Sequence, residues 1–192
     1  MNMKIIAGML GIVSLLTVNL ANAATLSLTP STLNVNTGDV FSLTVQGTEF
    51  VTGVSSGGVE ISWDANLVSL VSTLTDIQAS MQSNGFLDLG GSSVGPTNTV
   101  AVGGSFVGLP GPSFDFVTLQ FVALPPAQSG PINMVNSAFG AWQDAQTPAQ
   151  SIPDVIFEGA TINSTVVPVP AAVWLFGSGL LGLVGVARRR SA

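Results

Sequence analysis

The sequence is notable first for the residue types that it lacks. None of its 192 residues is Cys, His or Tyr, and only four are Lys or Arg. Without Cys there is no disulfide framework, so an exported domain must be held together by its core alone. Catalysis of the Ser–His–Asp or Cys–His kind needs an imidazole, and zinc, copper and iron sites usually draw on His or Cys. The composition therefore excludes His-dependent catalysis and disfavours these metal sites.

Positive charge is confined to the two ends of the chain, at Lys4 and at Arg188–Arg190. Residues 24–166 contain all ten Asp and Glu and no basic residue, which gives this segment a formal charge of −10. Its solubility therefore rests on net negative charge and on Ser, Thr, Asn and Gln. The segment has no cation with which to hold phosphate, so a nucleic-acid partner is excluded.

Residues 1–23 carry the features of a secretory signal peptide. Lys4 gives a short positive start, "IIAGMLGIVSLL" is an apolar run, and Ala21 and Ala23 are small residues with one residue between them. Signal peptidase accepts small side chains at those two positions. We therefore predict export and cleavage after Ala23 by signal peptidase. The alternative is an uncleaved N-terminal membrane anchor.

Residues 165–192 combine a proline motif, an apolar run and an arginine cluster. A helix over residues 171–187 would be about 25 Å long, slightly short of the hydrocarbon core but able to span it with adjustment at its ends. Arg188, Arg189 and Arg190 would then stop transfer and hold that end in the cytoplasm. The two prolines before the helix fix an extended backbone that a protease can read. We predict a transmembrane helix preceded by a processing site.

This C-terminal block resembles a known class of bacterial sorting signals. The stretch "VPVPAAVWLFGSGLLGLVGVARRR" (Val167–Arg190) is similar to the PEP-CTERM class, in the variant written VPLPA. The resemblance implies that an exosortase, a membrane-embedded transpeptidase of Gram-negative bacteria, cuts within the motif and releases the domain to the cell surface or exopolysaccharide matrix. The motif residues are Val167, Pro168, Val169 and Pro170. Val169 stands where the type motif has Glu and the variant has Leu, which leaves the cleaved bond open. The alternative is a permanent single-pass anchor.

Between the two signals, residues 24–164 are predicted to form an all-β domain. The stretch "DVFSLTVQG" (39–47) alternates apolar and polar residues, as does "GGVEISWD" (57–64). Apolar residues on both faces of "FDFVTLQFVAL" (114–124) predict a central strand. Gly and Pro clusters separate the segments, which favours a two-sheet sandwich. Further strands are expected in "TLSLTPSTLNV", "NTVAVGGSF", "GPINMVNSAF" and "VIFEGATINS". In "ANLVSLVSTL" (65–74) the leucine spacing fits a helix, but Val, Ser and Thr favour a turn followed by a strand.

The order of these segments resembles the cohesin-like domain, a jelly-roll sandwich related to certain carbohydrate-binding modules. The matching residues are "VNTGDVFSLTV", "GGVEISWDANLVSLVS", "FVTLQFVAL" and "FEGATIN". Cohesins often have Asp-Pro-x-x-Leu after an aromatic strand end, whereas this chain has Ala65 in place of the proline. The resemblance implies an all-β jelly-roll fold and a non-catalytic binding role.

Ten acidic residues leave two kinds of oxygen chemistry open. Two carboxylates about 5 to 9 Å apart would suffice for glycoside hydrolysis. Calcium needs only oxygen ligands, but no D-x-[DN]-x-[DN]-G loop occurs, and residues 34–39 and 143–146 are read as turns. The acids are more simply read as solvated strand faces and turn residues. We predict no catalytic residues and no cofactor or metal ligands, with calcium as the one ion left open.

Trp142, in the loop-like stretch "AFGAWQDAQ", is a candidate for stacking on a sugar ring. The alternative is that Trp142 covers the core beneath a long loop. Taken together, the sequence predicts a non-catalytic exported surface or matrix protein, adhesive or structural, that binds a surface protein or extracellular polysaccharide. The alternatives are a pure carbohydrate-binding module and a glycoside hydrolase that uses paired carboxylates.

Overall fold

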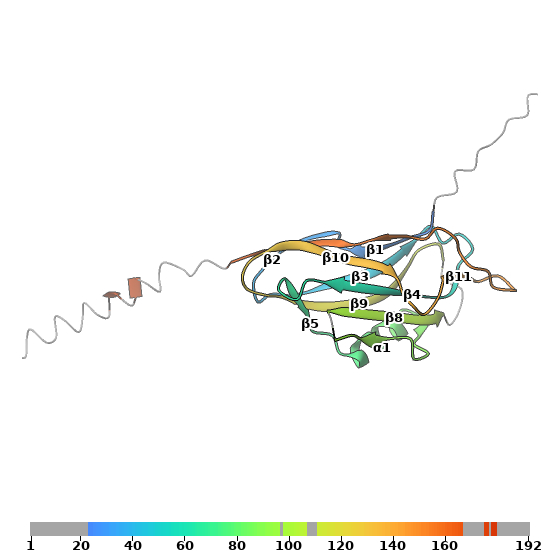
Figure 1. Ribbon diagram of the computed structural model, residues 1–192, viewed down its shortest axis with the longest axis horizontal. Coiled ribbons are helices and arrows are strands. Elements are labelled where there is room, and N and C mark those ends of the chain that lie inside the picture. The colour runs from blue at the N-terminus through green and yellow to red at the C-terminus, as the bar shows by residue number, and fades with distance from the viewer. Residues whose placement is uncertain (1–22, 97, 107–110, 167–174, 177, 180–192) are drawn as a thin grey trace, which may run out of the picture.

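The computed structural model describes residues 23–96, 98–106, 111–166, 175–176 and 178–179. They contain two β-sheets packed face to face, with the helix α1 along one open side of the sandwich (Figure 1). The elements in chain order are β1 Thr25–Thr29, β2 Thr32–Asn36, β3 Val40–Thr48, β4 Val54–Trp63, β5 Val68–Leu70, α1 Leu74–Ser83, β6 Phe86–Leu87, β7 Ser93–Val94, β8 Thr99–Phe106, β9 Phe114–Ala123, β10 Ser129–Asn136, β11 Gln143–Asp144, β12 Ile156–Glu158 and β13 Ala160–Thr165.

The strands divide between the two sheets in a fixed order. One sheet has the order β12-β1-β3-β9-β5, and the other has the order β2-β13-β10-β4-β8-β6, with β11 paired to β4 and β7 paired to β8. We call them the first and the second sheet. Every segment that the sequence predicted as a strand contains one, so the two-sheet sandwich is confirmed.

The first two strands of the chain pair in parallel with the last two. The chain passes from the first to the second sheet between β1 and β2, and again between β12 and β13, so that β1 pairs with β12 and β2 with β13. At the second crossing, the Thr161 N–H donates to the Ser31 carbonyl at 2.9 Å. Strand β1 begins at one end of the sandwich and β13 finishes at the other (Figure 1).

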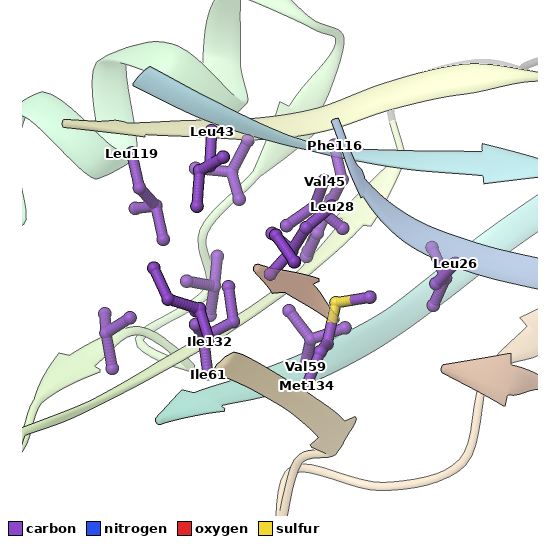
Figure 2. Close-up of a cluster of buried hydrophobic side chains, with 14 of the residues drawn as sticks. Leu26, Leu28, Leu43, Val45, Val59, Ile61, Phe116, Leu119, Ile132 and Met134 are labelled. Atoms are coloured by element: carbon purple, nitrogen blue, oxygen red, sulfur yellow. The ribbon is translucent and has the colours of Figure 1, made fainter. Parts of the chain in front are cut away.

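The core lies between the two sheets and is made by alternate residues of each strand. Leu26, Leu43 and Val45 point from the first sheet toward Ile61 and Ile132 of the second (Figure 2). All buried hydrophobic side chains of the described residues lie between positions 24 and 162. The core is confined in this way and the first two strands pair with the last two, so we expect residues 24–166 to fold without the flanking segments.

Strand β9 contains a bulge that its sequence pattern did not reveal. Its outward-facing residues include the exposed Gln120 and the half-buried Val122. Phe116 and Val117 are both buried because a bulge places Phe116 between the pairs Val45–Val117 and Gln46–Asp115. The predicted central position holds, since β9 lies between β3 and β5.

The segment after β4 contains the predicted turn and strand and a helix that the sequence did not predict. The turn leads into β5, and α1 follows, with Thr73 and Asp76 forming a reciprocal capping box. The helix buries Ile77 and Met81 and contacts β9 and β6. It thereby closes the open side between the two sheets.

Candidate functional site

A hollow lies on the outer face of the second sheet, near the ends of β4 and β8. Its floor is made by the cross-strand pair Ser56–Ser105 and by the neighbouring Gly103. Phe139, from the loop after β10, and Leu89, from the loop after β6, belong to its walls. Its volume is about 230 Å³. We call it the glycine hollow, because five of its lining residues are glycines: Gly57, Gly91, Gly103, Gly104 and Gly140.

Glycine at position 103 allows the Phe139 ring to lie directly on the sheet. A Cβ at Gly103 would lie 3.2 Å from Cδ2 of Phe139, which is tighter than ordinary contact. The Phe139 side chain is nevertheless 52% exposed, so part of its ring faces solvent. Leu89 is 74% exposed. The hollow therefore presents an aromatic surface and an aliphatic one.

The loop that carries Phe139 is held in place by hydrogen bonds to the sheet and within itself. The Ser137 N–H donates to the Gly58 carbonyl at 3.3 Å, and the Ser137 hydroxyl accepts the Phe139 N–H at 3.3 Å. The Gly140 N–H donates to the Ser137 carbonyl at 3.4 Å. Phe139 is thus fixed over the sheet before any ligand binds.

Trp142 anchors the same loop from inside the sandwich. Its side chain is 1% exposed, its Nε1–H donates to the Gly58 carbonyl at 3.1 Å, and its ring contacts Phe50 and Phe116. A Cβ at Gly57 would lie 2.2 Å from the indole, so the indole occupies the space that a side chain would need. Of the two interpretations of Trp142, the structure therefore supports the core residue, and the buried ring is not available to stack on a sugar.

Polar groups line the remaining part of the glycine hollow. The Ser56 hydroxyl donates to Oε1 of Gln143 at 3.2 Å, which fixes the side-chain amide of Gln143 at one edge. Ser105 lies opposite Ser56 across the two strands. Hydroxyl and amide groups of this kind both donate and accept hydrogen bonds, so the hollow suits a polar ligand without charge.

The lining of the glycine hollow contains no ionisable side chain. Four other hollows in the described part of the chain each include at least one carboxylate: Asp115 in one, Glu49 and Asp154 in a second, Asp88 in a third, and Asp154 in a fourth. This difference matters in a segment with ten acidic and no basic residues, because it makes the glycine hollow the neutral one among the five.

The acidic residues serve mainly to organise turns and loops. Oδ1 of Asp88 accepts the N–H groups of Gly90 and Gly91 at 2.9 and 2.8 Å, and Oδ2 accepts the Gln78 amide. Burial raises the pKa of Asp88, but the hydrogen bonds outweigh it and leave the pKa below its ordinary value. The hydrogen bonds from Thr73 likewise lower the pKa of Asp76. A general acid of a glycosidase needs a raised pKa, so neither carboxyl suits that role.

The described residues include the positions considered for calcium but only one of the predicted processing residues, Ala23. Within the described ranges no three His, Cys, Asp or Glu side chains are grouped so that they could hold a metal ion. Residues 34–39, considered for calcium, form the end of β2 and the turn that follows it, and residues 143–146 form β11 and the start of the next loop. Ala23 is half-buried just before the buried Ala24. The remaining processing residues lie outside the described part: Ala21, Val167, Pro168, Val169, Pro170, Arg188, Arg189 and Arg190.

Most of the predicted transmembrane helix over residues 171–187 also lies outside the described part. Residues 175–176 and 178–179 are described and are helical. Among the described residues, no helix has both the length and the apolar character needed to cross a membrane. The transmembrane helix therefore stays a prediction.

Sequence reasoning missed the residues that build the glycine hollow. Neither Phe139 nor the pair Gly103–Gly104 was predicted to form a site. The sequence contained one indication of this site, namely the glycines within the predicted strands β4 and β8. Glycine inside a strand often marks a position where another group approaches the backbone closely.

Comparison with known proteins shows a likeness of fold. No protein-family model matches the chain, and no curated protein matches its sequence. The seventh ScaB type I cohesin of Pseudobacteroides cellulosolvens matches with a TM-score of 0.58 at 11% identity, covering 77% of this chain and 96% of that one. A type I cohesin–dockerin complex from Clostridium thermocellum, Coh-OlpA-Doc918, matches with a TM-score of 0.57 at 15% identity, covering 75% and 100%.

A third similar structure is the cohesin CaCohA2 of Clostridium acetobutylicum, with a TM-score of 0.54 at 17% identity over 76% of this chain and 92% of that one. At identities this low the comparisons speak to the fold alone. The chain has a cohesin-like two-sheet sandwich, as the resemblance of its sequence implied.

Proposed function

We propose that this chain is a non-catalytic binding protein, exported through its N-terminal signal and delivered through its C-terminal signal to the cell surface or exopolysaccharide matrix of a Gram-negative bacterium. Signal peptidase would remove residues 1–23. An exosortase-type transpeptidase would read Val167–Pro170 while the helix and Arg188–Arg190 hold the chain in the membrane. The sandwich would then make the contacts for which the protein is displayed.

The observation that carries this proposal is the position of the glycine hollow relative to the C-terminal end of the sandwich. Strand β13 runs antiparallel to β10, and Asn163 near its end pairs with Ser129 at the start of β10. Phe139 follows the other end of β10, and eight extended residues span about 25 Å. A chain tethered beyond Thr165 therefore holds the glycine hollow at the far end, away from the membrane.

The electrostatics of the domain suit display in a polar medium. Ten carboxylates without any basic side chain keep copies of the domain apart and make it soluble. The hydrogen bonds that lower the pKa of Asp76 and of Asp88 make both carboxyls poor general acids. Binding, rather than catalysis, is the role that remains for the sandwich.

Two classes of partner are compatible with such a domain. Several structurally similar cohesins were solved in complex with dockerins, which suggests a protein partner for this chain as well. Because residues 24–166 have no cation, a protein that binds them would be expected to contribute Lys or Arg. Polysaccharide is the other class, and the uncharged glycine hollow favours it.

The experiment that tests display uses antibodies raised against residues 24–166. Intact cells of the native bacterium and their extracellular matrix should bind the antibody without permeabilisation. A chain with Arg188–Arg190 replaced by Ala should lose correct retention, whereas the double change Pro168→Ala and Pro170→Ala should keep the protein in the membrane fraction. Detection of the wild-type protein only after permeabilisation, in the cytosolic fraction, would contradict the proposal.

A further inference from the structure

The glycine hollow has the chemistry of a site for one sugar residue. We propose that it binds a neutral sugar residue within an extracellular polysaccharide, with Phe139 as the surface on which the sugar ring stacks. The inference deepens the proposed function, because it rests on display of the sandwich outside the cell. It replaces Trp142, which is buried, with a different aromatic residue of the same loop.

The apolar contacts to a bound sugar would come from the walls of the glycine hollow. A pyranose ring presents one face of C–H groups and a rim of hydroxyls, and the negatively polarised face of an aromatic ring attracts such C–H groups. Phe139 is the half-exposed aromatic residue of this lining, and Leu89 stands on the other wall. Glycine at position 103 allows the Phe139 ring to lie close to the backbone of β8.

The hydrogen bonds to a bound sugar would come from the floor and one edge of the glycine hollow. Among the described residues, the side chain of Gln143 is bonded only through Oε1, to the Ser56 hydroxyl, so its Nε2 group keeps both N–H donors. Ser105 has no side-chain hydrogen bond within that part of the chain, so its hydroxyl is available as donor or acceptor. Hydroxyl groups of a sugar are matched by groups of this type, which orient the ligand over the aromatic surface.

Charge decides which class of polysaccharide fits. The hollow has no ionisable side chain, and the surrounding domain carries ten carboxylates and no cation. An anionic polysaccharide would meet net repulsion with no basic group to bind its carboxylates or sulfates. A neutral polysaccharide meets no such penalty.

The loop that forms one wall of the glycine hollow is already ordered before a ligand binds. The loop from Ser137 to Trp142 is fixed by hydrogen bonds to the Gly58 carbonyl from outside and inside the sandwich. A preformed surface loses less conformational entropy on binding than a mobile loop does. A polysaccharide that repeats the same sugar also presents the ligand at a high local concentration, which favours retention of the domain.

The test uses purified residues 24–166, which contain the whole described core. Isothermal titration and native affinity electrophoresis would be run against dextran, laminarin, galactan and galactomannan, with alginate as the anionic comparison. We expect binding to at least one neutral polymer and none to alginate. Phe139→Ala should weaken that binding about tenfold, as the loss of one aromatic contact predicts.

Two further variants at the same position separate stacking from simple apolar contact. Phe139→Trp should retain binding, whereas Phe139→Leu should lose as much as Phe139→Ala, because leucine has no π-face. Val51→Ala is the matched control, since Val51 is an apolar residue that is 81% exposed in a different hollow and should leave binding unchanged. Equal thermal midpoints of wild type and variants would show that the fold is intact.

Three results would overturn the inference: no binding of the wild type to any neutral polymer, unchanged binding by Phe139→Ala, or full binding by Phe139→Leu. The last result, together with binding of a protein through the same hollow, would indicate a protein-docking surface instead. Because this test uses the purified domain, its failure is distinguishable from a failure of export, which only the cell-surface experiment measures.

Discussion

Replacement of Trp142 by Ala should be among the most damaging single changes in the sandwich. The indole is 1% exposed, contacts Phe50, Phe114 and Phe116, and bonds the Gly58 carbonyl. Truncation of a buried Trp costs about 3–5 kcal/mol, through lost burial and the cavity left behind. For a domain with a stability of about 5–15 kcal/mol, this is a large fraction of the total.

The milder Trp142→Phe change separates packing from hydrogen bonding. It keeps an aromatic ring in the core and removes the Nε1–H donor and part of the ring volume, so we expect a loss of about 1–2 kcal/mol. The Gly58 carbonyl still accepts the Ser137 N–H, so it is not left without a partner.

Urea unfolding of residues 24–166, followed by circular dichroism, measures both changes, with Phe139→Ala as the matched control from the same loop. Phe139 is half exposed, so its removal should cost no more than about 1 kcal/mol. The order of stability should be wild type, Phe139→Ala, Trp142→Phe and Trp142→Ala. If Trp142→Ala lowered stability by less than about 0.5 kcal/mol, as expected for an exposed residue, the assignment of Trp142 to the core would be refuted.

Three further predictions concern the packing and the turns. Gly57→Ala should lower the free energy of unfolding by about 1–3 kcal/mol, because its Cβ would overlap the Trp142 indole; an unchanged urea midpoint would contradict this. Thr73→Ala should cost about 0.5–2 kcal/mol by removing the cap shared with Asp76, which urea unfolding measures against Thr75→Ala in the same helix. Because the pKa of Asp88 is lowered in the folded state, its stabilising effect is present above about pH 4 and is lost as pH falls through the folded value. Urea midpoints measured from pH 5 to 2.5 should therefore fall less steeply in Asp88→Asn than in wild type, and parallel curves would refute this role.

The strands could be predicted from sequence because their residues alternate between core and solvent. In β4, Val59 and Ile61 face the core while Glu60 faces out, and this period of two is visible in the sequence itself. The same period of two assigns Phe116 to the wrong face of β9, because a bulge adds one residue there and shifts the alternation. Bulges depend on the partner strand, so a single segment does not reveal them.

The helix and the site were harder to predict, for different reasons. In α1 only Ile77 and Met81 are buried, so its apolar face is too narrow to stand out, although Thr73 and Asp76 formed a readable capping signal. The exposure of Phe139 and the burial of Trp142, three residues apart in one loop, are decided by Gly57 and Gly103 on neighbouring strands. Such a choice follows from tertiary contact and not from local sequence.

The central claim is that the sandwich is made for delivery outside the cell, with both terminal segments acting as processing signals. Mass spectrometry of the intact protein from the native bacterium tests this most directly, because it locates both ends of the chain at once. The account predicts a chain that begins at Ala24 and ends near Pro168–Pro170. A chain that still runs from Met1 to the C-terminal arginines, recovered from the cytosol, would contradict it.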